Sequence, residues 1–355
     1  MNLFVEFVQF SIGQKAQLSR KLSTDDWRYL FNESQRQSLL GIFMDGVERL
    51  VAMGEPKPSD LMKWIGLVLS IERRKELLDA KAAELTDSLA KDGFRSCVLK
   101  GQGYALLYPN PHRRQSGDID IWVEGSRDKI LGYLKRKYTV HNPVIHHVDV
   151  EVFDDVPVEV HFIPSYTYNP FRYRKFKKFF AKQAEAQFSN ICKKQGFAYP
   201  TMEFNGVYCL LHIFKHVLYE GIGLRQLLDY FYILKNCSDC KNEVWQNIRW
   251  MGLDKFAAAV MYVEQTVFGL EDAYLLCPPD EKNGRILLAE IERSGNFGKF
   301  DKRNSGVDDC NGIVRYLRNL KRNLQVFAFC PSEVLWSPIW KPCHLVWRYC
   351  KGYIG

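Results

Sequence analysis

The chain has 355 residues, of which 46% are hydrophobic and 25% are charged. This composition is typical of an ordinary globular protein with two or three modules, and it excludes a disordered or fibrous chain. Lys and Arg outnumber Asp and Glu by 49 to 41, so the formal charge of +8 favours acidic or phosphate-bearing ligands. The sequence contains no apolar run of the about 18 residues that a membrane span requires, so we expect no membrane span.

The N-terminal stretch MNLFVEFVQF is apolar, but it carries Glu6 in place of a basic leader and no small-residue cleavage site follows it. We therefore expect a cytoplasmic protein. The ten cysteines form no even framework, which suits a reducing compartment in which thiols stay free. Cys237 and Cys240 are close in sequence, but no second pair at matched spacing completes a zinc site.

Residues 1–90 are predicted to form an N-terminal helical module. Apolar residues between Leu61 and Ile71 recur at intervals of three and four, charged residues fill the other face, and Gly93 marks the end of the helix. Upstream, the segment 22–31 (LSTDDWRYLF) offers a Ser/Thr N-cap before another amphipathic turn.

Residues 91–185 are predicted to form a small α/β core, because the hydrophobic period changes there. Strands are expected at 94–99 and 118–124, and helices at 101–108 and 125–138. Two segments of period two, 144–153 and 156–163, meet at a turn-prone Asp-Asp-Val-Pro joint and predict an antiparallel hairpin. The expected fold class is α+β, a small mixed sheet with helices on one side, flanked by helical modules.

Residues 186–355 are predicted to form a C-terminal helical module, with helical periodicity in the segments 205–218, 221–236, 242–270 and 312–329. The Trp- and Pro-rich tail after residue 329 has no clear period, and we expect it to pack against these helices rather than to lie on a membrane. Basic and aromatic residues interleave at 171–183, which indicates either a solvated helix face or a strip that grips an anionic ligand, and we favour the former.

The strongest chemical signal is a pair of acids in the segment SGDIDIWV. Asp118 and Asp120 are two positions apart on a predicted strand, so both carboxylates point to the same face of the sheet. Two such anions repel each other, and a hard divalent cation such as Mg²⁺ compensates them best. Two-metal chemistry also needs a third carboxylate on a neighbouring strand. Glu159 is favoured over Asp149 and Glu151, because its flanks are more uniformly apolar.

Phosphate-binding residues are predicted nearby. The first strand leads into Lys100, Gly101 and Gly103, and free backbone N–H groups at the start of the following helix could hold a phosphate. Lys100 adds a mobile cation. Arg114, together with Arg113, precedes the acid pair and offers a guanidinium group whose geometry matches phosphate oxygens.

These residues resemble the nucleotidyltransferase superfamily of the DNA polymerase β type, and within it a poorly characterised bacterial group. The similarity is carried by Leu99-Lys100-Gly101, Leu107-Tyr108-Pro109, Arg114 and Asp118-Ile119-Asp120-Ile121, and by the later segments 212–216 and 221–230. The usual Gly-Ser after the first strand is Lys100-Gly101-Gln102 in this chain, so Lys100 is expected to take over the phosphate contact.

The resemblance implies that Asp118, Asp120 and Glu159 bind Mg²⁺ or Mn²⁺. It also implies transfer of a nucleotidyl group from a nucleoside triphosphate to an acceptor, with release of pyrophosphate and with Glu159 helping to deprotonate the acceptor. The acceptor stays open among a small molecule, a sugar, a protein and an RNA end. The alternative function is a catalytically inactive scaffold that binds a nucleotide or phosphate, and a metal-dependent phosphohydrolase is a third.

Two pairs on the later helices have more than one interpretation. His212 and His216 are four residues apart, a spacing that can hold zinc, but no Glu follows the first His, so packing or hydrogen bonding against the sheet is favoured. Arg225 and Asp229 form either a plain surface pair or a pair in which Asp229 holds Arg225 in the nucleotide-binding cleft.

Overall fold

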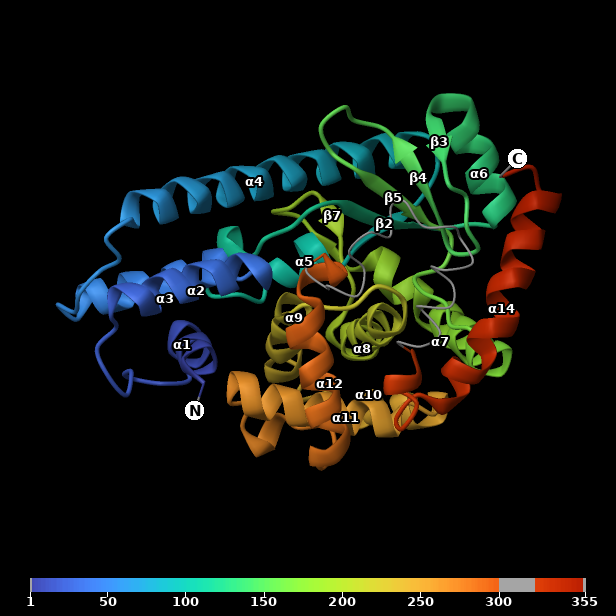
Figure 1. The fold of residues 1–355 in the computed structure, drawn as a ribbon. Coiled ribbons are helices and arrows are strands. Elements are labelled where there is room, and N and C mark those ends of the chain that lie inside the picture. Colours follow the sequence, from blue (N-terminus) through green and yellow to red (C-terminus); the bar gives the residue numbers. More distant parts are fainter. Residues whose placement is uncertain (1, 300–322, 354–355) are drawn as a thin grey trace.

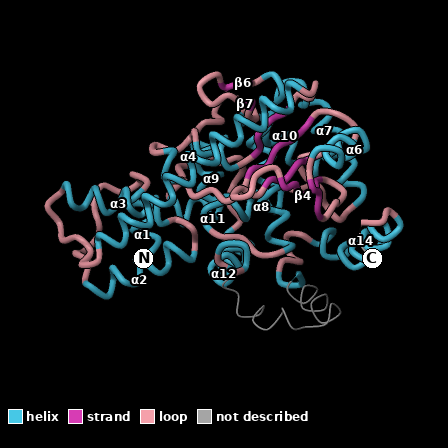
Figure 2. The backbone as a smooth tube through the Cα atoms, turned by 90° about the horizontal axis from the view of Figure 1, so that it is seen from above, coloured by secondary structure: helices cyan, strands magenta, loops and turns pink. Residues whose placement is uncertain are grey.

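The computed structural model of the chain describes residues 2–299 and 323–353. The first four helices are α1 (Leu3–Ser11), α2 (Thr24–Arg36), α3 (Leu40–Ala52) and α4 (Leu61–Lys91), as the sequence predicts. Ser23 caps α2 through a reciprocal pair of hydrogen bonds with Asp26, which satisfies two backbone N–H groups at the helix start. Figure 2 shows α1, α2 and α3 at one end of the molecule, away from the strands.

The middle of the chain forms a five-stranded mixed sheet. Its strands are β1 (Ser96–Leu99), β2 (Ile119–Val123), β3 (Thr139–His141), β4 (His147–Glu151) and β5 (Val158–His161), in the order β1-β2-β5-β4-β3. Strands β2 and β5 are parallel, whereas the other neighbours are antiparallel. The predicted hairpin is confirmed as β4 and β5, and the α+β fold class is confirmed with it.

Helices cover both faces of this sheet, so the prediction of helices on one side was wrong. One face buries the apolar side chains of β2, β4 and β5 against α6 (Arg127–Lys137) and the second half of α4. Figure 1 shows α4 running above the sheet. On the other face, Trp122 of β2 contacts Phe188 of α7 (Pro170–Ser189) and Phe204 of α8 (Met202–Tyr219), with ring centroids 4.7 and 6.0 Å apart. A tryptophan on that face demands apolar cover, which α7 and α8 supply.

Helix α7 carries the basic stretch 171–183. Phe176, Phe179 and Phe180 are buried, whereas Arg174 and Lys178 are exposed. This division of the helix into an apolar and a charged face matches the favoured interpretation as a solvated helix face.

The rest of the described chain is mainly helical. It comprises the short strands β6 (Ile191–Cys192) and β7 (Phe197–Ala198), and the helices α9 (Leu224–Lys235), α10 (Lys241–Met251), α11 (Asp254–Val263), α12 (Glu281–Ser294) and α14 (Pro331–Cys350). Most of the helix predicted at 312–329, with its basic residues, lies outside the described residues. A single large apolar core joins the N-terminal helices to α7–α12 and α14, so hydrophobic contacts cross the expected module boundaries at 90 and 185.

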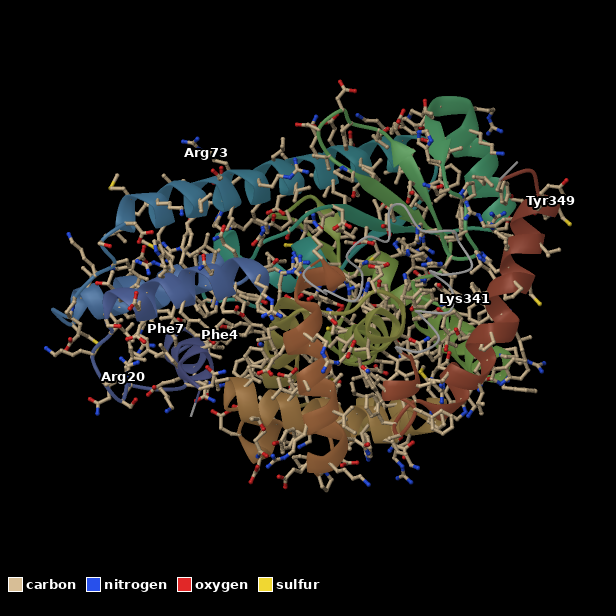
Figure 3. The ribbon with its side chains drawn as sticks, in the orientation of Figure 1. Phe4, Phe7, Arg20, Arg73, Lys341 and Tyr349 are labelled. Carbon is tan, nitrogen blue, oxygen red and sulfur yellow. A yellow bond between two sulfur atoms is a disulfide. The ribbon has the colours of Figure 1, made fainter. Side chains whose placement is uncertain are left out.

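The Trp-rich tail forms α14, although Pro338 and Pro342 lie inside it. Trp336 and Trp340 pack against the large core, whereas Tyr349 is 67% exposed and points away from the molecule in Figure 3. The ring contacts of these tryptophans outside the tail are with Tyr166, Tyr168 and Phe171, which precede residue 186, so packing of the tail against the C-terminal helices stays a prediction. In the described ranges, no helix is both long enough and apolar enough to cross a membrane.

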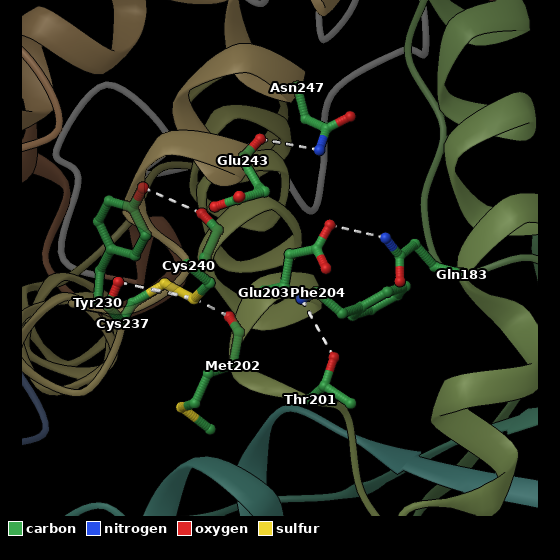
Figure 4. The surroundings of a disulfide bond; sticks show 11 residues. Gln183, Thr201, Met202, Glu203, Phe204, Tyr230, Cys237, Cys240, Glu243 and Asn247 are labelled. Carbon is green, nitrogen blue, oxygen red and sulfur yellow. Dashed lines mark hydrogen bonds between the residues drawn. A yellow bond between two sulfur atoms is a disulfide. The ribbon is translucent and has the colours of Figure 1, made fainter.

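One disulfide departs from the expectation of free thiols. The turn between α9 and α10 brings the Cα atoms of Cys237 and Cys240 to 5.3 Å, a separation that suits a disulfide, and the two sulfur atoms are bonded. Figure 4 shows this bond beside Met202 at the start of α8. Seven other cysteines in the described residues are free, as predicted.

Candidate functional site

A polar cleft of about 380 Å³ opens between the sheet and the helices α8 and α9. The residues that line it are Lys100, Gly101, Tyr104, Arg114, Gly117, Asp118, Asp120, His147, Asp149, Glu159, His212, Lys215, His216, Glu220, Arg225, Gln226 and Asp229. The structure therefore brings together seven of the eight site residues that the sequence predicts. Gly103 does not line the cleft, because it lies against Tyr199, whose Cβ would be 3.3 Å from an added Cβ.

The three acids meet because of strand register. Asp120 on β2 is paired with Glu159 on the parallel strand β5, and Asp118 comes just before β2 on the same side. One carboxylate oxygen from each of Asp118, Asp120 and Glu159 can be chosen so that all three lie within 4.8 Å of one another. Sequence spacing predicts the Asp pair, but only the parallel pairing of β2 and β5 places Glu159 beside it.

Lys100 enters the cleft through an unusual backbone conformation. Its φ of +54° lies in the left-handed region, which costs energy for a residue with a side chain. The turn at the end of β1 therefore depends on Lys100 rather than on Gly101. The helix that follows, α5 (Gly101–Ala105), has five residues, so its dipole contributes little to anion binding.

The Lys100 ammonium forms an ion pair with one of the three acids. Its Nζ lies 2.6 Å from Oδ1 of Asp120, and Nε2 of His161 lies 2.9 Å from the same oxygen. Burial alone would raise the pKa of Asp120, but the Lys100 charge and the His161 hydrogen bond hold it below its usual value. Asp120 is thus already compensated by two neighbouring groups.

Asp118 and Glu159 are in different electrostatic states. Burial and the charge of Asp120 raise the pKa of Asp118 to about 6. No ion pair joins Asp118 to any residue that the structure describes. Burial also acts to raise the pKa of Glu159, but its hydrogen bond to His161 and the neighbouring His147 lower it overall. An incompletely compensated carboxylate among converging oxygen atoms fits a hard divalent cation such as Mg²⁺.

Arg114 and Arg225 have partners other than the predicted ones. Arg114 is buried and donates two hydrogen bonds, of 2.8 and 2.7 Å, to the carboxylate of Asp229. Tyr108 donates a third hydrogen bond to Asp229 at 2.7 Å. The carboxylate expected to hold Arg225 therefore holds Arg114, and Arg225 donates to the backbone carbonyl of Gln115 at 2.6 Å. Both guanidinium groups still reach the cleft.

The two histidines on α8 line the cleft side by side, with ring centroids 4.3 Å apart. Within the described part of the chain, two groups of three side chains could hold a metal ion, and neither includes His212 or His216. The interpretation that the pair packs or hydrogen-bonds against the sheet stays a prediction.

Sequence reasoning assigned no role to Lys215, His146, His147 or His161. Lys215 comes from α8, one residue before His216, and its Nζ lies 3.0 Å from Nε2 of His146. The three histidines lie on or beside β4 and β5. The sequence did contain a signal for the histidines on the strands, namely the alternation with period two in HHVDVE and VEVH. Once the register of the hairpin is known, this alternation puts four side chains on the same face of the sheet: His147, Asp149, Glu159 and His161.

Comparison with protein families gives one match. A family model described as an uncharacterised nucleotidyltransferase covers residues 23–269, which include the whole sheet, the cleft and α7–α11. Comparisons with curated proteins and with solved structures find no match.

Proposed function

The chain belongs to this family of uncharacterised nucleotidyltransferases, and from that premise we propose a specific reaction. The protein transfers a nucleotidyl group from a nucleoside triphosphate to an acceptor and releases pyrophosphate, with Mg²⁺ or Mn²⁺ held by Asp118, Asp120 and Glu159. The observation that carries this proposal is the convergence of those three carboxylates within 4.8 Å in a cleft that also contains four cationic side chains.

The cations of the cleft suit a triphosphate. Lys100, Lys215 and Arg225 all line it and are half-buried. Lys215 and Arg225 have lowered pKa values, of about 8 and about 10, because burial disfavours their charged forms. A bound phosphate would restore the balance of charge, so binding an anion there is favourable. Arg114 fixes the carboxylate of Asp229 in the cleft, and we propose it as a positioning residue.

The bound divalent cation would neutralise charge that develops on the α-phosphate and orient the attacking and leaving oxygens. The protein's own residues would hold the triphosphate in line, exclude water from the buried end of the cleft and keep the carboxylates ionised. Because its pKa is lowered, Glu159 is a weak base, and we propose it as a metal ligand. The substrate acceptor would have to enter through the open side of the cleft.

One observation favours the alternative, a binding scaffold without catalysis. Asp120 is already paired with Lys100 at 2.6 Å and with His161 at 2.9 Å, so protein groups compensate its charge. If Lys100 keeps this contact when a nucleotide binds, it competes with a metal for Asp120. In a working enzyme, Lys100 must turn towards the phosphates when the metal arrives.

The two functions are separated by pyrophosphate release. The full chain is incubated with each of the four nucleoside triphosphates, Mg²⁺ and pooled acceptors, and compared with the double variant Asp118→Asn plus Asp120→Asn. We expect the double variant to lose at least about 100-fold of the rate, because the charge that stabilises the transition state is removed. The matched control is Glu151→Gln, an exposed acid on β4 that lies outside the cleft lining and should retain the rate.

Equal pyrophosphate release from the wild type and the double variant would exclude catalysis by this site. Nucleotide binding without any release from the wild type would favour the scaffold. Nucleotide binding itself is measured by titration calorimetry on the same preparations.

A further inference from the structure

A second row of side chains lies next to the acids on the same face of the sheet. The strand register pairs Asp120 with Glu159 and Glu159 with Asp149, which makes one row. It pairs Trp122 with His161 and His161 with His147, which makes the next row. An acidic row therefore runs across β2, β5 and β4, beside a row that consists of Trp122 on β2 and the imidazoles of His161 and His147 on β5 and β4, and Glu159 is adjacent to both histidines.

The distances within this group match those of a binding site. Nε2 of His161 lies 3.5 Å from Oε2 of Glu159, and Nδ1 of His147 lies 3.7 Å from the same oxygen. Ligand atoms of His147, Glu159 and His161 can be chosen within 4.8 Å of one another. The imidazole centroids of His147 and His161 are 5.3 Å apart. One ion could thus be reached by all three side chains.

The two ring atoms that face Glu159 also contact protein atoms, because Nε2 of His161 lies 2.9 Å from Oδ1 of Asp120 and Nδ1 of His147 lies 2.9 Å from Nε2 of His146, so an ion would replace these two contacts. His146 and His161 are buried, at 3% and 1% exposure, and Nδ1 of each has no hydrogen-bond partner among the described residues. Buried polar atoms without a partner are rare in folded proteins and need a reason. Two imidazoles, those of His147 and His161, lie within 3.7 Å of the same carboxylate oxygen of Glu159, an arrangement that one metal ion could bridge.

We propose that His147, His161 and Glu159 form a second metal site, which binds a nitrogen-preferring divalent transition metal such as Zn²⁺ or Co²⁺. Two imidazoles and one carboxylate suit these ions, whereas Mg²⁺ prefers oxygen ligands only. Glu159 is shared with the proposed Mg²⁺ position, so the two ions lie on either side of one carboxylate. The site does not depend on the proposed function, because ion binding needs no nucleotide.

The neighbouring Asp149 supports the orientation of the His147 ring. The imidazole of His147 turns Nδ1 to Glu159 and places Nε2 3.6 Å from Oδ1 of Asp149. A carboxylate behind a histidine ligand fixes the ring orientation, and loss of such a partner typically weakens metal binding by about 10–100-fold. Asp149→Asn is therefore expected to weaken binding to that extent.

The test uses Co²⁺ as a spectroscopic probe. The full chain is stripped with a chelator, dialysed, and titrated with Co²⁺ in the presence of excess Mg²⁺, which fills oxygen-only sites. We expect one equivalent of Co²⁺ per chain with visible absorption bands of a nitrogen-ligated ion, and competition by Zn²⁺. His147→Ala and His161→Asn should each weaken binding by more than about 100-fold, since a lost ligand costs more than a lost supporting partner.

Two control variants locate the ion. Asp118→Asn removes an acid of the proposed Mg²⁺ position only, and His141→Ala removes an exposed histidine on β3 that pairs with Glu151. Both should bind Co²⁺ as the wild type does. Because His161 is buried, thermal unfolding followed by circular dichroism checks each variant, and the partly exposed His147 provides the decisive one if His161→Asn unfolds.

Absence of saturable Co²⁺ binding by the folded wild type would overturn the proposal. Wild-type affinity in a folded His147→Ala variant would do the same, and so would loss of binding in Asp118→Asn, since the ion would then lie at the acid group. Failure of pyrophosphate release with retained Co²⁺ binding would reject the proposed function and leave the second site standing.

Discussion

At the residue scale, Lys215 is a lysine of the cleft whose charge changes near neutral pH. Burial and then the charge of Lys100 lower its pKa to about 8, and it lines the cleft. Below pH 8 the side chain is a cation that attracts phosphate, and above pH 8 it becomes neutral. Anion binding should therefore be strongest on the acidic side of this pKa and should be lost as the pH rises through it.

We predict that the affinity of the protein for inorganic pyrophosphate falls as the pH increases from 7 to 9. Lys215→Arg should remove this fall, because a guanidinium stays charged across the range. Titration calorimetry at each pH measures the dissociation constant. A fall of the same size in Lys215→Arg would show that another group causes it.

Arg114 lies in the cleft as predicted, but its contacts give it a different role from the predicted one. Sequence spacing places it in the cleft, where the structure finds it, but its guanidinium is buried and saturated by Asp229, with side-chain exposures of 6% and 3%. Such a pair is costly to break, because the remaining partner is left as an unpaired buried charge. The phosphate contact falls instead to Lys100, Lys215 and Arg225 in the proposed function.

At the element scale, the packing of α8 against α10 depends on a glycine. A Cβ added at Gly206 would lie 2.7 Å from Cγ2 of Val244, so the two helices are in close contact there. Glycine within a helix normally lowers stability, and its presence here is explained by this close approach. The site helix α8 is thereby held at a fixed distance from its neighbour.

We predict that Gly206→Ala destabilises the protein by about 1–3 kcal/mol, as overpacking usually does. Adding Val244→Ala should restore part of the loss, since it removes the clashing methyl groups. The matched control is Gly66→Ala in α4, where an added Cβ meets nothing within 4 Å. That control should raise stability by about 0.5–1 kcal/mol.

Chemical unfolding in urea gives the free energy of unfolding for each variant. If Gly206→Ala and Gly66→Ala changed stability equally, close contact between α8 and α10 would not be the reason for the glycine.

At the scale of the whole molecule, α14 runs from the start of α7 towards α6. It starts at α7, where the fully buried Glu333 accepts a hydrogen bond from Arg172 at 2.6 Å and one from the backbone N–H of Tyr168 at 2.8 Å. It ends beside α6, where the hydroxyl of Tyr353 accepts a hydrogen bond from Arg127 at 2.9 Å. Figure 1 shows α14 along this edge of the molecule.

Between these ends, α14 packs against an aromatic residue next to the histidines of the candidate site. Trp340 stacks on Tyr166 with centroids 5.0 Å apart, and Tyr166 contacts the ring of His146 at 4.3 Å. The C-terminal helix is therefore coupled to the candidate site through two aromatic contacts, although it does not line the cleft.

We predict that Glu333→Ala destabilises the protein by about 3–5 kcal/mol, because it leaves Arg172 and two backbone N–H groups without their acceptor. Glu281→Ala, which breaks an exposed pair with Arg285, is the control and should change stability by less than about 0.5 kcal/mol. Unfolding in urea measures both, and limited proteolysis should release the C-terminal helix first in Glu333→Ala. Equal stability of the two variants would show that Glu333 does not anchor α14.

The sequence by itself determined many of the helices, the strands β1, β2, β4 and β5 and the first half of the candidate site, but not β3, β6, β7 or α14. Hydrophobic periodicity is a local property, so the helices of residues 1–90, the strand of Asp118 and Asp120 and the β4–β5 hairpin could all be predicted. The side of the strand to which both aspartates point follows from the same period of two.

Only the tertiary structure decided which distant groups meet. The parallel pairing of β2 with β5 places Glu159 beside the aspartates, and the hairpin register places His147 opposite His161. The choice of Arg114 rather than Arg225 as the partner of Asp229, and the cover of α7 and α8 over Trp122, likewise depend on packing between segments far apart in sequence. Contacts of this kind arise from the burial of one surface against another, which no single stretch of residues specifies.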